Sequence, residues 1–272
     1  MPTISIDGRK MYFEMHGEGE PVLALGGFPL TTGPGFLNQP AALRERFRVV
    51  VFDHRGFGQS EDDGADPSTR LYAEDAARLL DAIGLQRVHL LGAGGLGACI
   101  AQHLAAGRPD LVHDLVLSAG WAAPEPYHHA QQRLMLMLRG LEDTTFYSLF
   151  TALLVLRPEH FTEERLEARA KAADSQSGTW KQRQKAHLKL LQANYEHDAT
   201  GILGDIACPT LVTCGEYDLL GGPRLAGALA AAIPGSAFKV IPDIGHVYGA
   251  DPAAHATYGD MVTSFFAAHP LA

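Results

Sequence analysis

Two residues in the last quarter of the chain are of types that form an acid–base pair. Asp218 follows the apolar run 211–214 in the segment Gly-Glu-Tyr-Asp, and His246 follows the run 238–241 after a glycine. A carboxylate that accepts the Nδ1 proton of an imidazole fixes the tautomer whose Nε2 is free, and it stabilises the imidazolium that forms later. We therefore predict that His246 is a general base and that Asp218 orients it.

Such a pair commonly activates a hydroxyl nucleophile that is held at a sharp strand-to-helix turn. The segment with this pattern is 90–102, Leu-Leu-Gly-Ala-Gly-Gly-Leu-Gly-Ala-Cys-Ile-Ala-Gln, and it contains no serine. Counting from Gly92 places the nucleophile position at Gly94, whereas counting back from the helix places it at Gly95. Cys99 lies more than a turn into the expected helix, where its thiol should face the core. The nucleophile position is therefore degenerate in both registers.

A second glycine-rich turn supplies backbone donors. The apolar run 22–25 leads into Gly26-Gly27-Phe28-Pro29, where the backbone must turn sharply and expose an N–H. We predict that the N–H groups of Phe28 and Gly95 form an oxyanion hole and that Gly27 contacts the substrate. Trp121 is the second expected substrate-binding residue, with plain packing as the alternative.

The elements that position these residues alternate along the chain. Short apolar runs indicate buried strands, and amphipathic segments between them, such as 70–83 and 224–233, indicate crossover helices. Two leading strands, 4–6 and 11–15, are expected to form a hairpin around Asp7-Gly8. This pattern predicts an α/β fold with a doubly wound, mostly parallel, eight-stranded sheet, whose other strands are expected at residues 22–25, 48–52, 88–91, 115–118, 211–214 and 238–241.

The alternation is interrupted between Trp121 and residue 207. Helical periodicity continues there, with Gly140, Pro158 and Gly178 as punctuation. We predict a helical cap at 121–207, inserted into a core formed by residues 1–120 and 208–272. Its apolar side chains are expected mostly to pack the cap helices together, with a role in a substrate pocket as the alternative.

Three motifs follow expected strands in the order found in the α/β-hydrolase superfamily. Residues 53–60 read Asp-His-Arg-Gly-Phe-Gly-Gln-Ser and match the D-x-R-G-x-G-x-S loop, and Gly-Glu-Tyr-Asp at 215–218 and Gly-His at 245–246 come after it. The chain resembles this superfamily over nearly its whole length. The resemblance implies the α/β-hydrolase fold, with Asp218 and His246 as acid and base. The charged residues that begin the loop are expected to hold it in place rather than to react.

Three further segments resemble a narrower group. They are Ser-Ala-Gly-Trp at 118–121 with Pro-Glu-Pro-Tyr at 124–127, Leu-Leu-Val-Leu-Arg-Pro at 153–158, and Gly-Phe-Pro-Leu at 27–30. They are similar to the aminoacrylate hydrolase of the pyrimidine-utilisation pathway and, next, to 3-oxoadipate enol-lactonase. The resemblance implies a cofactor-independent hydrolase of a small enamine, enol-lactone or ester-like metabolite. The aminoacrylate group carries alanine where serine is usual, so a natural glycine fits it.

Several functions are open for this set of residues. His246 can activate a water that fills the volume of the absent serine hydroxyl, while Phe28 and Gly95 hold the oxyanion. Alternatively, His246 removes a proton from the substrate, as in a lyase, cyclase or decarboxylase. The chain can also be an inactive binding protein, or the glycine can be an engineered change that traps a ligand. We expect hydrolysis by a water that His246 activates, because an intact acid and base would be unexplained in an inactive protein.

The composition narrows the class of partner. The 272-residue chain has a formal charge of -9, which disfavours nucleic acid and anionic membrane surfaces. Its three cysteines, without Cys-x-x-Cys spacing, indicate neither a disulfide framework nor a thiolate metal site. The N-terminus lacks the pattern of a signal peptide. We expect a cytoplasmic protein with a small-molecule substrate, no cofactor and no metal, as a monomer or a homodimer.

Overall fold

The computed structural model describes residues 3–27, 40–143, 145–165, 167 and 180–271. Eight strands form one sheet in the order β1-β2-β4-β3-β5-β6-β7-β8. The strands are β1 (Thr3–Ile6), β2 (Arg9–His16), β3 (Pro21–Leu25), β4 (Arg48–Phe52), β5 (Val88–Ala93), β6 (Val112–Ser118), β7 (Thr210–Gly215) and β8 (Ala237–Ile241). β2 runs antiparallel to β1 and β4, and the remaining neighbours are parallel. The predicted fold class is confirmed.

The leading hairpin turns where the sequence predicts it. β1 pairs with β2, and Ile6 lies opposite Arg9. Asp7 and Gly8 between them have φ angles of 50° and 78°. Two successive positive φ angles are the requirement of the tight turn that matches the twist of a two-stranded ribbon, and Asp-Gly meets it with little strain.

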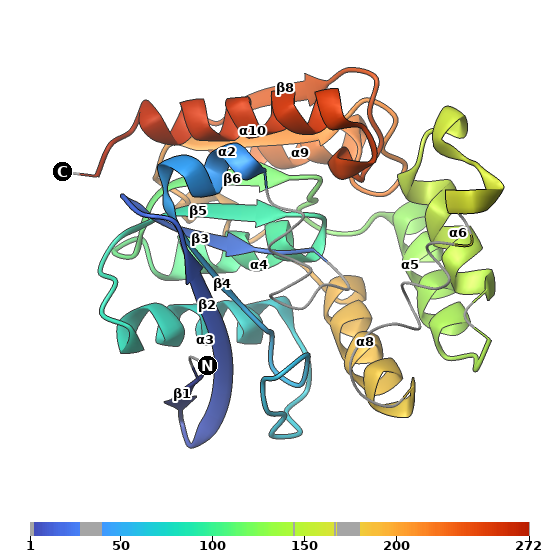
Figure 1. The fold of residues 1–272 in the computed structure, drawn as a ribbon, viewed down its shortest axis with the longest axis horizontal. Coiled ribbons are helices and arrows are strands. Elements are labelled where there is room, and N and C mark those ends of the chain that lie inside the picture. The colour runs from blue at the N-terminus through green and yellow to red at the C-terminus, as the bar shows by residue number, and fades with distance from the viewer. Residues whose placement is uncertain (1–2, 28–39, 144, 166, 168–179, 272) are drawn as a thin grey trace.

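Helices cover both faces of the sheet (Figure 1). α3 (Thr69–Ala82), α4 (Leu96–Gly107) and α9 (Pro223–Ala232) pack on one face, and α2 (Ala41–Arg46) and α10 (Pro252–Ala267) pack on the other. Side chains of a strand point alternately to the two faces, so Leu23 and Leu25 join the first core while Val22 and Ala24 join the second. Burial on both faces explains why these strands read as continuous apolar runs.

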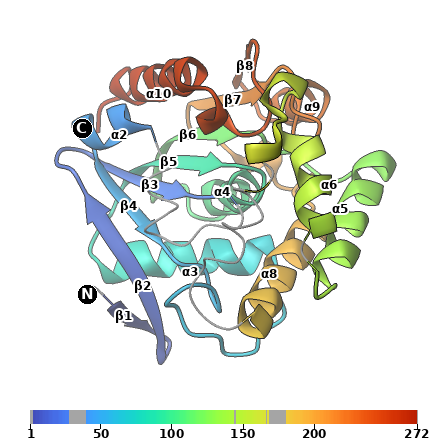
Figure 2. The same cartoon turned by 45° about the vertical axis from the view of Figure 1, so that its right-hand side comes forward.

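Between β6 and β7 the chain leaves the sheet. This β6–β7 segment contains α5 (Pro126–Arg139), α6 (Thr145–Val155), α8 (Trp180–Tyr195) and the 3-10 turns η1 (Pro158–His160) and η2 (Leu203–Asp205). Figures 1 and 2 show its helices beside the edge toward which β3, β5 and β6 point. The Leu219 N–H donates to Leu154 O at 3.2 Å, and the His246 N–H donates to Val155 O at 3.0 Å. The segment is thus fixed to the loops that follow β7 and β8.

The apolar residues of this segment are only partly packed. Met135 is buried, as expected for contacts between helices. The expectation that apolar side chains pack the helices together is wrong for four other residues, because one side of α5 and of α6 is exposed to solvent. These exposed residues are Leu134, Phe146, Leu149 and Leu153. Among the residues that the structure describes, every helix is too short or too polar to span a lipid bilayer.

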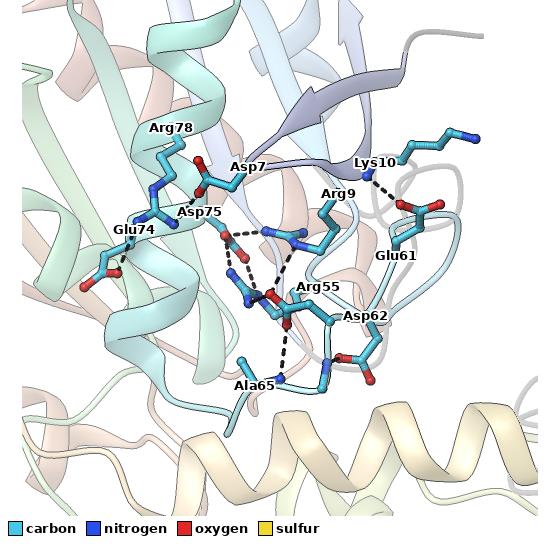
Figure 3. A network of polar contacts seen from close by, with 12 residues as sticks. Asp7, Arg9, Lys10, Arg55, Glu61, Asp62, Ala65, Glu74, Asp75 and Arg78 are labelled. Carbon is cyan, nitrogen blue, oxygen red and sulfur yellow. Dashed lines mark hydrogen bonds and ion pairs between the residues drawn. The ribbon is translucent and has the colours of Figure 1, made fainter.

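The loop after β4 is held by charged side chains, as the sequence predicts (Figure 3). Asp75 on α3 is fully buried and accepts hydrogen bonds from Arg55 Nε (2.9 Å) and Nη2 (2.7 Å) and from Arg9 Nη2 (2.6 Å). Asp53 Oδ2 accepts the N–H of Gln59 at 2.8 Å, which closes the turn. Both carboxylates are therefore occupied by the structure of the loop.

Candidate active site

The predicted acid and base are in direct contact. His246 Nδ1 lies 2.8 Å from Asp218 Oδ2. The other carboxylate oxygen, Oδ1, accepts the backbone N–H groups of Leu220 at 2.8 Å and Gly221 at 2.9 Å. Because these donors fix the carboxylate, its second oxygen can only face the imidazole. The arrangement favours the tautomer with the proton on Nδ1, which leaves Nε2 as an acceptor.

Close backbone contacts bring the two loops together. The Glu216 and Tyr217 N–H groups donate to Ile241 O and Ile244 O, at 2.9 Å and 2.8 Å. A Cβ atom on Gly215 would lie 2.3 Å from Gly245 O, so only glycine permits this approach. The carboxyl ends of neighbouring parallel strands are the usual place for ligands in such sheets, and β7 and β8 end here.

The turn between β5 and α4, called the elbow below, contains Gly94 and Gly95, the two glycines at which the sequence leaves the register of the nucleophile position open. Gly94 has φ +67°, and Gly95, the residue directly before α4, has φ 65° and ψ -86°. The Gly95 carbonyl accepts the first helical hydrogen bond, from the Cys99 N–H at 2.9 Å. Leu96 is the first residue of the helix, where backbone N–H groups have no partner within the helix.

The two glycines face different neighbours. A Cβ atom on Gly94 would lie 3.0 Å from Gly27 Cα, at the turn after β3. A Cβ atom on Gly95 would lie 3.0 Å from Trp121 Cη2 and 3.8 Å from Asn194 Nδ2. A side chain at position 95 would therefore contact the edge of the indole ring. Phe28, the predicted second donor of the oxyanion hole, lies outside the described residues.

Trp121 is positioned by the end of β6 and by α4. Ala119 has φ +58°, which is rare for a residue with a side chain and turns the chain toward the elbow. Gln102 Nε2 donates to the Trp121 carbonyl at 3.0 Å. The indole is fully buried in a cluster that includes Cys99 and Leu191. Burial also raises the pKa of the Cys99 thiol, as expected for a core residue.

Sequence reasoning missed three polar side chains near Trp121. The His128 ring on α5 packs edge-on against the indole, with centroids 4.3 Å apart, and Gln132 Nε2 lies 3.1 Å from His128 Nε2. Asn194 is the penultimate residue of α8. Burial lowers the pKa of His128 to about 4, so its imidazole is neutral at neutral pH. No short motif marks these residues, because two of them lie on α5 and the third lies on α8.

Within the described part of the chain, no group of three or more histidine, cysteine, aspartate or glutamate side chains is arranged to hold a metal ion.

Comparison with known proteins shows the family to which the chain belongs. A family model described as alpha/beta hydrolase fold matches residues 20–248. A protein of Caulobacter sp. (strain K31) named "Putative carbamate hydrolase RutD" is 32% identical over 256 residues, which cover 90% of this chain and 91% of that protein. A protein of the same name from Klebsiella pneumoniae (strain 342) is 34% identical over 230 residues, covering 84% and 85%. The enol-lactonase structure from Burkholderia xenovorans LB400 superposes with a TM-score of 0.82 over 97% of this chain and 99% of that one, and its 20% identity shows a shared fold alone.

Proposed function

The chain belongs to the α/β-hydrolase fold family, and from that premise we propose that it hydrolyses a small carbonyl metabolite with water in place of a covalent nucleophile. The observation that carries this proposal is the Asp218–His246 pair, with 2.8 Å between Oδ2 and Nδ1, in a chain whose β5–α4 turn has glycine at both candidate nucleophile positions. An oriented general base without a side-chain nucleophile has water as its natural partner.

In this mechanism, His246 Nε2 removes a proton from water, and the oxygen of that water bonds to the carbonyl carbon of the substrate. The carbonyl π electrons move to its oxygen and form a tetrahedral oxyanion. When the intermediate collapses, the bond to the leaving group breaks and the imidazolium returns its proton to the departing nitrogen or oxygen. Asp218 stabilises the imidazolium between these steps.

Backbone N–H groups stabilise the oxyanion. In this family the donors are the residue after the nucleophile position and a residue of the turn after the third strand. We favour Gly95 as the nucleophile position because it directly precedes α4, and the first donor is then Leu96. In the register that places the nucleophile position at Gly94, the donor is Gly95 itself. Phe28 is the proposed second donor in both cases, with Gly27 beside the substrate.

The substrate class follows from the relatives and the β6–β7 segment. The relatives are named as carbamate hydrolases, and a carbamate, an ester or an enamine-derived carbonyl has a leaving group that the imidazolium can protonate. We propose that residues 121–207 act as a cap over the site. Hydrogen bonds from Leu219 and His246 to α6 support this placement, because they join the segment to the acid and base loops.

Labelled water and a histidine variant test the mechanism. A panel of small carbamates, esters and enol-lactones is screened for turnover, and the active compound is converted in H₂¹⁸O. We expect one ¹⁸O atom in the acid product and loss of turnover in His246→Ala. His129→Ala is the matched control, since His129 is an exposed histidine on α5. Turnover without ¹⁸O incorporation would instead identify a lyase or cyclase, and turnover that persists in His246→Ala would refute His246 as the base.

A further inference from the structure

Two buried side chains of the β6–β7 segment lie in the direction that a side chain at Gly95 would take. A Cβ atom at Gly95 would lie 3.0 Å from Cη2 and 3.2 Å from Cζ3 of Trp121, and 3.8 Å from Nδ2 of Asn194. Trp121 is 0% exposed and Asn194 is 5% exposed. The first neighbours of this elbow glycine are therefore an indole edge and a carboxamide.

Several polar atoms in this lining lack a hydrogen-bond partner among the described residues. They are Asn194 Oδ1, Trp121 Nε1, His128 Nδ1 and Gln132 Oε1. His128 and Gln132 are both fully buried, and they continue the lining through the contacts of His128 with the indole and with the Gln132 amide. Buried polar groups are normally paired, and leaving them unpaired costs free energy. A ligand with matching donors and acceptors removes that cost.

The lining also carries no formal charge. His128 is a neutral imidazole at neutral pH because burial lowers its pKa to about 4. Its Nε2 accepts from the Gln132 amide, so Nδ1–H is left as a donor, and the oxygens of Asn194 and Gln132 are left as acceptors. A carboxylate bound here would lose its hydration without gaining a cation, which is unfavourable. A neutral group that has C=O and N–H side by side has no such penalty.

The helix that carries Asn194 is held against the core. Lys189 Nζ on α8 forms an ion pair with Asp62 Oδ2 at 2.7 Å, in the loop after β4. Leu190 and Leu191 are buried on the same helix. These contacts fix α8 and with it the amide of Asn194, so the lining is preorganised for a ligand.

We propose that Asn194, His128 and Trp121 form the subsite that binds an uncharged carboxamide-type group of the substrate and rejects a carboxylate in its place. The subsite rests on the proposed function, because it places the bound carbonyl beside Gly95 and the base. Asn194 is the specificity-determining residue, since its amide is the polar group nearest to the elbow among the described neighbours of Gly95.

The test measures binding rather than turnover. The full chain with His246→Ala is labelled with ¹⁵N and titrated with acetamide and, separately, with acetate. The chain has two tryptophans, so Trp180→Phe assigns the indole N–H signal of Trp121. We expect acetamide to shift this signal in a saturable manner and acetate to leave it unchanged. Asn194→Leu should weaken acetamide binding about tenfold, the loss expected for one buried hydrogen bond.

Two further variants keep the result interpretable. Gln192→Leu changes a side chain that hydrogen-bonds Glu196 on the outer side of α8, and it should retain the parent affinity. If Asn194→Leu does not fold, Asn194→Asp keeps the size of the side chain and should also lose acetamide. Saturable acetate binding of equal strength, or unchanged acetamide affinity in both Asn194 variants, would overturn the subsite. Acetamide binding as expected, in a parent chain that hydrolyses none of the carbamates, esters and enol-lactones of the panel, would refute only the proposed function.

Discussion

Replacing Asp218 by asparagine tests the acid–base pair by a change that preserves the shape of the side chain. Asp218 Oδ1 accepts two backbone N–H groups, and Oδ2 faces His246 Nδ1 at 2.8 Å. In Asp218→Asn, the amide oxygen must take the place of Oδ1, because an NH₂ group there would face two other donors. The NH₂ group is then directed at His246 Nδ1.

The consequence is a change of tautomer. His246 Nδ1 must accept this hydrogen bond, so the ring proton moves to Nε2, the atom that has to be unprotonated to activate water. In a Ser-His-Asp triad the equivalent exchange lowers kcat about 10⁴-fold through the wrong tautomer. The proposed mechanism uses the same lone pair on Nε2, so we expect a loss of roughly 10³- to 10⁴-fold, or about 4–5.5 kcal/mol of activation free energy.

Three measurements check this prediction. The ¹⁵N chemical shifts of the His246 ring should report the Nδ1–H tautomer in the parent chain and the Nε2–H tautomer in Asp218→Asn. Steady-state kinetics with the substrate found in the screen give the change in kcat. Thermal unfolding of both chains serves as the control for folding. A kcat within tenfold of the parent, or an unchanged tautomer in a folded variant, would refute the reasoning.

Three other predictions follow from local geometry. In urea unfolding, Gly95→Ser should lower the free energy of unfolding by about 1–3 kcal/mol, because φ is positive there and the new side chain contacts Trp121. Adding Trp121→Leu to the Gly95→Ser chain should restore the share of that loss that comes from the contact. Asp75→Ala removes the buried carboxylate of Arg9 and Arg55, which keep only the partly exposed Asp63, and should cost about 3–5 kcal/mol in the same assay. Loss of the exposed neighbouring carboxylate in Glu74→Ala should cost less than about 1 kcal/mol. Burial lowers the pKa of His54 and His128 to about 4, so below about pH 6.5 the unfolded chain binds protons that the folded chain does not. The free energy of unfolding should therefore fall as pH drops from about 6.5 to about 4, and His128→Phe should reduce that slope; equal slopes in the two chains would contradict the prediction.

The central strands β3 to β7 were predictable because the sheet is buried on both of its faces there, so residues on both sides of the pleat are mostly apolar. The expected runs in the outer strands also lie within observed strands, although β8 is largely exposed. β6 shows where the pattern fails. This strand begins at Val112, whereas the apolar run begins only at residue 115. The run is shorter because Asp114 is polar, yet this side chain is fully buried in the strand, with Oδ1 2.9 Å from His89 Nδ1 on the adjacent strand. A polar pair that is hydrogen-bonded across two strands interrupts an apolar run without interrupting the sheet.

The composition of the site was predictable only where a motif follows a strand. Asp218 and His246 follow β7 and β8, and parallel strands bring their carboxyl ends to one edge. His128 and Asn194 lie on helices of the β6–β7 segment, and their distance from the elbow depends on how α5 and α8 pack. Helical periodicity indicates which face of a helix is apolar, but not which neighbour that face meets. The same limit explains the exposed apolar residues of α5 and α6.

The elbow register follows from which neighbours can move. A Cβ atom on Gly94 would press on the Cα of Gly27, so a side chain there would have to displace backbone in the turn after β3. A Cβ atom on Gly95 would meet only side chains, the indole of Trp121 at 3.0 Å and the amide of Asn194 at 3.8 Å. Side chains adapt more readily than backbone, so position 95 can hold a serine within this fold at a moderate cost. A Cβ atom on Gly97, two residues later, would lie 2.2 Å from Leu25 O at the end of β3. Glycine at position 97 therefore lets the start of α4 approach β3 closely. These contacts support the proposal that Gly95 is the equivalent of the nucleophile and that the ring of Trp121 would be the first neighbour of a side chain there.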